Sequence, residues 1–401
     1  MKLRVFFTAI FMFFVASLLL SGNDIKNDEN EEGYVFRDEI IIPFTSVKDQ
    51  YRSGTCWSFT VLSLLESEMM RLGKAEADLS EMFIVWHVYS EKAKKYVRMH
   101  GSLNFSAGGA FHDVTNVISK YGIVPESVYS GLADSESKHV HAEMDNALRR
   151  YVDSVVKNDK LSTAWHDDVE KTLDSYLGKI PQAFEFEGKK YTPQSFAIDY
   201  VGLNMDDYVE ITSYTHHPFY SKFILEIPDN WSWDEIYNVP LHDMMDIIDY
   251  AIKNGFTVAW ASDISEKGFV TNNKGIAVVP AAPSSNMTNE EFALWEALPE
   301  KDREDKLYEL NAIVPELTIT QEMRQQAFDN FETTDDHGMH IIGVSKDQAG
   351  NEFYKVKNSW GDYNKYNGFF YASKPYVAYK TMSIMLHKDA IPQNIREKLK
   401  L

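Results

Sequence analysis

The chemistry that this sequence suggests begins at its single cysteine. Cys56 stands at the start of a predicted helix, because apolar residues follow it at helical spacing from Val61 to Met69. The unpaired N–H groups and the dipole of a helix N-terminus favour a thiolate, which is the reactive form of cysteine. A free cysteine is nevertheless more often a buried and inert side chain. Taken alone, Cys56 is a candidate nucleophile, but the inert structural interpretation is the more common one.

Two motifs near the other end of the chain supply partners for such a nucleophile. The first is Asp336-His337-Gly338-Met339-His340, and the second is Asn358-Ser359-Trp360-Gly361. Acyl transfer by a thiol needs a base, a group that orients the base, and donors for the developing oxyanion. These motifs offer an imidazole and a carboxamide, so they favour the nucleophile interpretation of Cys56.

Together with Gln50 and Gly54-Thr55-Cys56-Trp57, these motifs resemble those of the papain-like cysteine peptidases, in the same order. The resemblance implies that Cys56 is the nucleophile, that His337 is its acid/base partner, and that Asn358 orients the imidazole. It also implies an oxyanion hole made by the side-chain amide of Gln50 and the backbone N–H of Cys56.

The resemblance gives supporting roles to three neighbours of these residues. Trp360 would cover the bond between His337 and Asn358, and Trp57 directly follows the nucleophile. Asp336 would contribute charge near the ion pair, although an acid beside a histidine is as often a plain loop residue. Both interpretations of Asp336 stay open.

Two histidines compete for the role of the base. In a strand, residues three apart point to opposite faces, so His337 and His340 cannot both line one site. The family motif places a small residue after the histidine, which fits His337-Gly338 and does not fit His340-Ile341. His337 is therefore the predicted base.

A glycine pair is the candidate site for the substrate backbone. In papain-like enzymes such a pair lets an extended peptide approach closely, because glycine has no Cβ. Gly108 and Gly109 occupy this place in the motif order. On local grounds a simple turn is an equal alternative.

The stretch between Cys56 and His337 is much longer than the roughly 130 to 150 residues of ordinary papain-like enzymes. The surplus must carry its own structure. We expect a helical insertion at about residues 131–200 and a second helix-favouring stretch at residues 289–310. This enlarged arrangement resembles the bleomycin hydrolase and aminopeptidase C branch of the family, as do Thr215–Tyr220, Tyr237–Pro240 and Ala251–Val258.

The expected fold class is α+β, with a papain-like arrangement of two halves. A helical half would contain Cys56, and an antiparallel β-barrel-like half would contain His337, with the active site between them. Residues 34–390 would form this peptidase domain. The expected strands of the second half cover residues 257–261, 337–344, 352–357, 368–372 and 381–387.

The N-terminal residues resemble an export signal. Lys2 and Arg4 precede an apolar run from Val5 to Leu20, which predicts a secretory signal peptide over residues 1–22. An acidic linker over residues 23–33 would follow. The protein would then be periplasmic or secreted, and an uncleaved helix that anchors it in a membrane is the alternative.

The resemblance implies a cysteine aminopeptidase that hydrolyses N-terminal residues from peptides through an acyl-enzyme intermediate. In bleomycin hydrolase-like enzymes the C-terminus lies in the cleft, so residues 391–401 could enter it and the Leu401 carboxylate could pair with a substrate ammonium group. A frayed or helical tail is the alternative. Without a tail in the cleft, a papain-like endopeptidase is expected. A catalytically silent peptide-binding protein is a third hypothesis, against which the intact set of Gln50, Cys56, His337 and Asn358 argues.

Composition limits the partners. The formal charge of −20 argues against binding to nucleic acid, because phosphate contacts require clustered Lys and Arg. Adjacent histidines such as His216 and His217 share no face in a helix or a strand, so no metal site is expected, and no cofactor is expected either. The single cysteine excludes an internal disulfide. The resemblance further implies a homo-oligomer such as a hexamer.

Overall fold

The computed structural model describes residues 33–132, 137–282, 293 and 295–401. The predicted signal peptide, and the predicted linker apart from Gly33, lie outside the described residues. No helix within the described ranges is long and apolar enough to cross a membrane.

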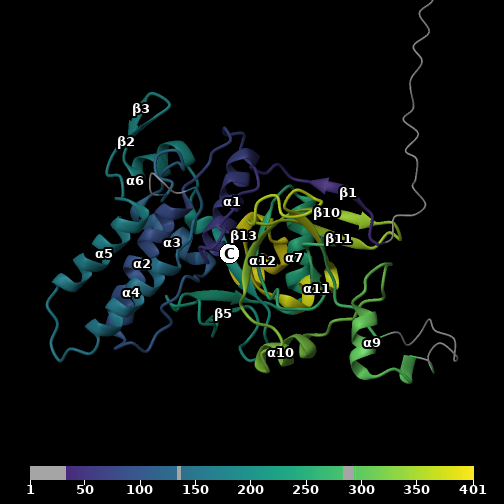
Figure 1. Ribbon diagram of the computed structural model, residues 1–401. Helices are drawn as coiled ribbons and strands as arrows, with labels where there is room; N and C mark the ends of the chain where they lie inside the picture. The colour runs from purple at the N-terminus through teal and green to yellow at the C-terminus, as the bar shows by residue number, and fades with distance from the viewer. Residues whose placement is uncertain (1–32, 133–136, 283–292, 294) are drawn as a thin grey trace, which may run out of the picture. The chain divides into compact units, whose positions relative to one another are not determined.

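The first part of the described chain is helical. It contains α1 (Cys56–Arg71), α2 (Glu81–Arg98) and α3 (Phe111–Tyr121) (Figure 1). Every residue of α1 from Trp57 to Met69 is buried, as expected for a helix enclosed by other elements. The Ser80 side chain caps α2 by accepting a hydrogen bond from Phe83 N at 3.1 Å. The expected helical half with Cys56 at a helix start is therefore present.

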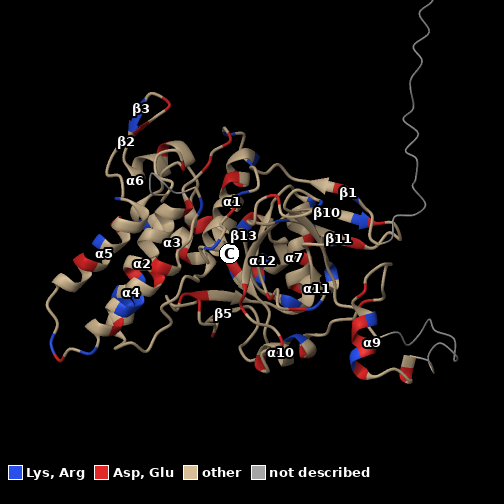
Figure 2. Cartoon of the chain, viewed as in Figure 1, with Lys and Arg blue, Asp and Glu red and all other residues tan. Residues whose placement is uncertain are grey.

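The expected insertion at residues 131–200 contains two long helices, α4 (Ala142–Val155) and α5 (Ala164–Leu177). Each buries one apolar stripe against α2 and shows its charged residues on the other face (Figure 2). The insertion is not purely helical, however. It also holds a hairpin of β2 (Phe184–Phe186) and β3 (Lys189–Tyr191), followed by the single turn of α6 (Pro193–Phe196) and a π-helical turn (Ala197–Val201). Aromatic side chains of the hairpin pack on Phe196, a contact that local periodicity does not reveal.

The second part is built on one large mixed sheet. Its strands are β1 (Phe36–Ile41), β4 (Tyr208–Thr212), β5 (Ser221–Ile224), β6 (Glu235–Asn238), β7 (Val258–Ser262), β8 (Phe269–Val270), β9 (Ile276–Ala277), β10 (His337–Asp347), β11 (Glu352–Lys357), β12 (Phe369–Ser373) and β13 (Thr381–His387). Their order is β5-β6-β4-β13-β7-β10-β11-β12-β9-β8, with β1 beside β10. Most pairs are antiparallel, whereas β4–β6 and β12–β9 are parallel. The five strands expected for this half lie at their predicted places within a few residues, so the α+β class is confirmed.

Further helices belong to this second part. They are α7 (Leu241–Lys253), α9 (Glu300–Leu307), α10 (Gln321–Asp329), α11 (Lys374–Lys380) and α12 (Gln393–Leu399), with short 3-10 turns at Met205–Asp207 and Lys388–Ala390. Ile247, Trp260, Ile341 and Ile395 belong to one buried cluster, which α7 and α12 share with the strands. Of the expected stretch at residues 289–310, α9 is seen, while residues 289–292 and 294 lie outside the described ranges.

The two parts meet where α1 packs against β10. Gly338 makes this approach possible, because a Cβ there would lie 3.0 Å from Thr60 Oγ1 and 3.4 Å from the Cys56 carbonyl oxygen. The start of α1 is thus held directly against the start of β10. This contact brings the helix that carries the thiol to the strand that carries the histidine.

Candidate active site

Cys56 is a partly exposed free thiol at the first position of α1. The preceding residue, Thr55, makes no side-chain capping hydrogen bond to the helix. Ser58 N donates to the Thr55 carbonyl at 3.0 Å, whereas the N–H of Cys56 has no hydrogen-bond partner among the described residues and is available to a ligand, as an oxyanion hole requires. Cys56 thus begins a helix, as the sequence predicted, while its role as the nucleophile stays a prediction.

Cys56 and His337 line the same narrow pocket, which has a volume of about 30 Å³. His337 is the first residue of β10, and its Nε2 lies 2.8 Å from Asn358 Oδ1. Two other hydrogen bonds fix the amide orientation, since Ser359 N donates to Oδ1 and Asn358 Nδ2 donates to the Tyr363 hydroxyl. Because Oδ1 can only accept, Nε2 carries the proton and Nδ1 is the imidazole nitrogen left for the thiol.

The indole of Trp360 covers this histidine. The two rings stack with their centroids 4.7 Å apart and their planes 26° apart. Phe269 and Tyr363 pack edge-on against the same indole. The His337–Asn358 bond is thereby sheltered in the way that the resemblance implied.

His340 lies on the other side of β10. It is buried, and its Nδ1 is 2.9 Å from Ser63 Oγ, a hydroxyl that also accepts a hydrogen bond from Lys357 Nζ. His337 and His340 therefore point to different environments, as the strand alternation predicted.

The Gln50 side chain is oriented by a neighbour of the triad. Its Oε1 accepts a hydrogen bond from Ser359 Oγ at 2.6 Å, and its backbone N donates to the Ser359 carbonyl at 2.8 Å. With Oε1 engaged, Nε2 is the atom that can donate to a substrate oxyanion. The geometry thus agrees with the role that the resemblance implied for Gln50.

The glycine pair lies in a tightly packed segment beside the pocket. Trp57 Nε1 donates to the Ala107 carbonyl at 3.1 Å, and the buried Lys92 ammonium donates to the carbonyl oxygens of Ser106 and Gly108. A Cβ on Gly109 would lie 2.9 Å from the Trp57 ring, and one on Gly108 would overlap the Asp229 carboxylate. The space beside the two glycines is thus filled by Trp57 and Asp229, and Gly109 lines the pocket of Cys56, so the predicted contact of this pair with a substrate backbone stays a prediction. Trp57 thereby gains a specific supporting function.

Burial sets the ionisation of the reactive pair. It raises the pKa of the Cys56 thiol to about 12, although the backbone N–H groups of Gly338 and Trp57 act in the opposite direction. It also lowers the pKa of His337 to about 4, against the effect of the Asn358 hydrogen bond. Burial therefore disfavours each charged form taken alone, and a thiolate beside an imidazolium would offset part of this effect.

Asp336, a predicted supporting residue, makes its hydrogen bonds to a loop and none to His337. Asp336 is exposed and holds a loop: its Oδ2 accepts from the backbone N of Ile264 and Ser265, and its Oδ1 accepts from the Thr334 hydroxyl. It also lines the pocket, so both sequence interpretations of Asp336 have support.

Leu401 is not brought to the pocket. It follows α12, its backbone N donates to the Arg396 carbonyl, and its side chain packs against the buried cluster of the β half. None of the residues 391–401 lines the pocket of Cys56. The structure thus favours the helical-tail alternative, because Ile395 and Leu399 are buried more fully in that cluster than a tail crossing the cleft would allow.

Four polar residues of the pocket were not among the sequence candidates: Glu210, Asp229, Asp335 and Ser383. A signal existed for one of them. Asp335 lies two residues before the predicted base His337 in the sequence, in the segment that leads into β10. Asp229 and Glu210 come from segments whose approach to Cys56 depends on the tertiary fold.

His216, His217 and Glu226 form a group whose ligand atoms lie within 4.8 Å of one another. The rule that neighbours share no face does not apply, because these histidines lie in a turn. Both imidazoles reach the same carboxylate, at 3.0 and 2.9 Å, and this carboxylate already satisfies them. The expectation of no metal here stays a prediction.

Comparisons with known proteins agree with this geometry. Residues 19–281 and 301–401 match the family described as the Peptidase C1-like family. The chain is 24% identical to aminopeptidase C of Streptococcus thermophilus, over 92% of this chain and 86% of the relative. It is 23% identical to aminopeptidase G of Lactobacillus delbrueckii subsp. lactis, over 91% and 85%. The crystal structure of PepW from Lactobacillus rhamnosis HN001 has the same fold, with a TM-score of 0.67, 21% identity and coverage of 91% and 84%.

Proposed function

Because this chain belongs to the Peptidase C1-like family and is a cysteine-type peptidase, we propose that it is an aminopeptidase that removes N-terminal residues from peptides. Two kinds of observation support the proposal. Relatives that align over most of the chain are named aminopeptidases. The pocket also holds a thiol and an oriented imidazole, and Gly109 lines it.

In the proposed mechanism, Cys56 Sγ attacks the carbonyl carbon of the first peptide bond while His337 Nδ1 takes the thiol proton. The carbonyl oxygen becomes an oxyanion, and Gln50 Nε2 and the Cys56 N–H donate to it. The C–N bond then breaks, and the imidazolium returns the proton to the leaving amine. Water hydrolyses the resulting aminoacyl thioester, with His337 as the base, and restores the free thiol.

One observation carries this mechanism. The hydrogen bond between His337 Nε2 and Asn358 Oδ1, sheltered by Trp360, leaves Nδ1 for a pocket that Cys56 also lines.

Replacement of the nucleophile tests the proposal. The Cys56→Ser variant should lose peptide turnover and, since Cys56 is the only cysteine, all labelling by iodoacetamide. Circular dichroism should show an unchanged fold. Turnover by this variant at more than a few per cent of the native rate would exclude the cysteine mechanism.

An endopeptidase is the second candidate, and a specific observation favours it. Residues 391–401 do not line the pocket, and a cavity of about 400 Å³ adjoins it, with Ile227, Asp229 and Asp335 common to both. A longer peptide could extend into that cavity. Comparison of a free peptide with its N-acetylated form separates the candidates, because only an endopeptidase should cleave both equally.

We also propose that the chain is exported by its N-terminal segment and that it acts as a homo-oligomer. The basic and apolar pattern of residues 1–22 supports export, with a membrane anchor as the alternative. N-terminal sequencing of the protein from fractionated cells tests export, since a mature N-terminus near residue 22 is expected. Light scattering on the purified protein tests assembly. A measured mass equal to that of one chain, 46.1 kDa, would contradict the homo-oligomer.

A further inference from the structure

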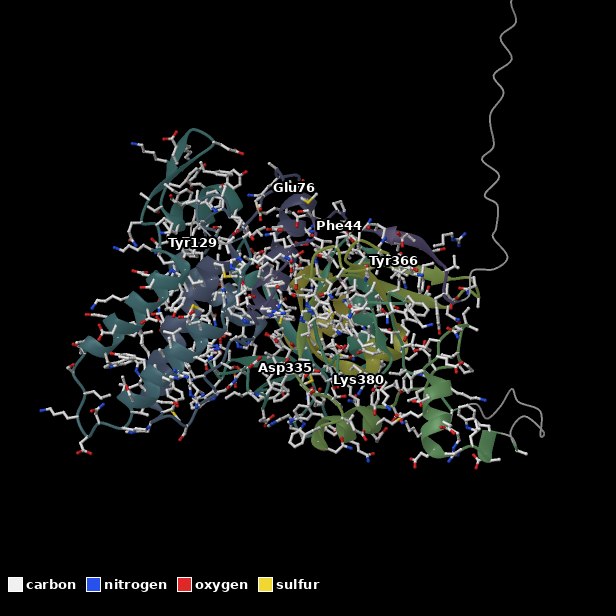
Figure 3. All side chains as sticks on the ribbon, viewed as in Figure 1. Phe44, Glu76, Tyr129, Asp335, Tyr366 and Lys380 are labelled. Atoms are coloured by element: carbon white, nitrogen blue, oxygen red, sulfur yellow. The ribbon has the colours of Figure 1, made fainter. Side chains whose placement is uncertain are left out.

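The pocket that holds the nucleophile is lined by several carboxylates. Glu210, Asp229 and Asp335 reach it from three different segments, and Figure 3 shows Asp335 where the helical part meets the strands. A peptide backbone is neutral, so this lining is not needed to bind it. The carboxylates call for a positive group on the substrate.

Glu210 already has its partners within the protein. Its Oε2 lies 2.8 Å from His112 Nδ1, and its Oε1 accepts a hydrogen bond from Ser383 Oγ at 2.6 Å. Burial works against the charged imidazole, yet the nearby Glu210 carboxylate raises the pKa of His112 to about 9. The pair is therefore a neutralised ion pair, and Glu210 is not the group that lacks a counter-ion.

Asp229 and Asp335 differ from Glu210 in this respect. Within the described part of the chain, neither carboxylate has a cationic nitrogen within 4.0 Å, and Asp335 accepts no hydrogen bond. Asp229 accepts one, from Asn104 Nδ2 at 3.2 Å. Burial raises the pKa of Asp335 well above its usual range, and the charge of Asp229 adds to this effect. The charge of the buried Lys92 ammonium opposes the effect of burial on the pKa of Asp229, whereas only burial and neighbouring carboxylates act on Asp335. Asp335 is therefore the acid that lacks a cation, and Asp229 beside it adds to the negative charge, as expected of a site that binds a positive group.

Their position relative to the reacting atoms is specific. Asp335 lies two residues before His337, and the Asp229 carboxylate fills the space above Gly108, where a Cβ would lie 1.9 Å from Oδ2. Both acids stand at the junction between the narrow pocket of Cys56 and the adjoining cavity of about 400 Å³. A substrate whose carbonyl meets Cys56 would place the atoms preceding that residue at this junction.

We propose that Asp335 and Asp229 bind the free α-ammonium group of the substrate and so select peptides with an unblocked N-terminus. This inference rests on the proposed aminopeptidase function and names the residues that determine it. An ammonium group bound there would pair with both carboxylates and satisfy them. An N-acylated peptide would leave them buried and unpaired, which costs binding free energy.

The experiment compares two substrates on three variants. Alanyl-aminomethylcoumarin and its N-acetyl form are assayed with the native enzyme, Asp335→Asn, Asp229→Asn and, as a matched control, Asp329→Asn. Asp329 lines the outer cavity only, so its variant changes the net charge equally without altering the junction. Titration of Cys56 with iodoacetamide gives the concentration of competent sites, so that loss of folded enzyme is separated from loss of selectivity.

The native enzyme should prefer the free amine. In Asp335→Asn and Asp229→Asn, kcat/KM for the free amine should fall roughly 10- to 100-fold while that for the acetylated substrate stays constant or rises. The control variant should keep the native ratio. A native ratio retained in both Asp335→Asn and Asp229→Asn would overturn the inference and leave the aminopeptidase function intact. Equal cleavage of both substrates by the native enzyme would instead contradict the function itself.

A basic side chain is the other possible source of the positive charge. N-acetyl-lysyl-alanyl-aminomethylcoumarin places a lysine ammonium, with no α-ammonium, before the residue that acylates Cys56. If the two variants lose activity on this substrate while they keep the native preference for free alanine, the acids recognise a side chain and the inference is wrong. Loss confined to the free amine supports the α-ammonium.

Discussion

The amide of Gln50 shows how one hydrogen bond decides which atom of a side chain can act. Ser359 Oγ donates to Gln50 Oε1, which leaves Nε2 as the donor. Ser359 lies between Asn358 and Trp360 in sequence, so the same short segment orients the histidine, shields it and orients the oxyanion donor. Asn358, Ser359 and Trp360 follow one another in the chain because each contacts a different side of the same small site.

This arrangement predicts the effect of removing the donor. The Gln50→Ala variant should lower kcat/KM by roughly 100- to 1000-fold, because one oxyanion-hole donor is lost. Labelling of Cys56 by iodoacetamide should continue, since the thiol and His337 remain.

The Ser359→Ala variant is the control. It removes the hydrogen bond that orients the amide but keeps Nε2, so it should lose less activity than Gln50→Ala. If Gln50→Ala stays within threefold of the native kcat/KM, Gln50 does not stabilise the oxyanion.

Most of the catalytic residues could be predicted from local sequence, because their motifs encode short-range geometry. Strand alternation predicted that His337 and His340 have different surroundings, and their hydrogen bonds confirm this. The choice of His337 as the base came from the family motif and stays a prediction. Asp229 could not be predicted in this way, since its approach to Gly108 arises from a loop more than a hundred positions away in the chain.

At the scale of elements, an ionic cluster joins the segment before Cys56 to two helices. Lys48 Nζ lies 3.1 Å from Glu66 of α1, 2.7 Å from Glu81 of α2 and 2.6 Å from Asp78. The carboxylates of Glu66 and Glu81 are buried, and Glu66 also accepts from the backbone N of Leu79 at 2.9 Å. Burial raises the pKa of Glu81 to about 7, and the Lys48 charge opposes this rise.

Removal of the cation should therefore destabilise the fold in a pH-dependent way. The Lys48→Met variant should lose roughly 3 kcal/mol of unfolding free energy at pH 8, because buried carboxylates lose their partner. A carboxyl whose folded pKa is raised contributes stability that is present below its unfolded pKa, near 4.5, and is lost as the pH rises toward 7. The variant lacks the ammonium that opposes this rise, so its deficit should be smaller at pH 5 than at pH 8.

Urea unfolding followed by tryptophan fluorescence at both pH values measures this difference. Lys171→Met is the control, because its pair with Asp168 is exposed and should contribute nothing measurable. Equal deficits for Lys48→Met at pH 5 and pH 8 would contradict the role assigned to Glu81.

Strands were predicted more completely than the insertion, and the reason is physical. The five predicted strands carry closely spaced apolar and aromatic residues, such as Phe353, Tyr354 and Val356 in β11, so their local signal is strong. The hairpin Phe184–Tyr191 is short, and it is held by aromatic contacts to α6 that no local period encodes. The resemblance left open a tail in the cleft or a helical tail, and the burial of Ile395 and Leu399 on the β half favours the helical tail.

At the scale of the whole molecule, the position of the tail leads to a prediction about selectivity. Deletion of Leu401 alone should leave the preference for free over N-acetylated substrate unchanged, because Leu401 packs outside the pocket. A tenfold or larger fall in that preference would show that the tail reaches the cleft.

A longer deletion separates selectivity from stability. Removal of residues 391–401 takes away Ile391, Ile395 and Leu399, each of which is almost fully buried and contributes about 1.5 to 3 kcal/mol. The melting temperature measured by calorimetry should therefore fall clearly, while any enzyme that stays folded keeps its preference. An unchanged melting temperature would contradict the packing of α12.

The most direct test of the central claim is the mass of the enzyme during turnover. The substrate is a fast-reacting tetrapeptide analogue in which an ester replaces the first peptide bond. It is mixed with the enzyme, the reaction is quenched in acid, and the mass of the intact protein and of its peptides is measured. The peptide that contains Cys56 should gain the mass of a single aminoacyl residue, which is transferred when the ester bond after the first residue breaks. An increment on a residue other than Cys56 would contradict the cysteine mechanism. A larger acyl group, taken from the N-acetylated tetrapeptide as readily as from the free one, would contradict the aminopeptidase function.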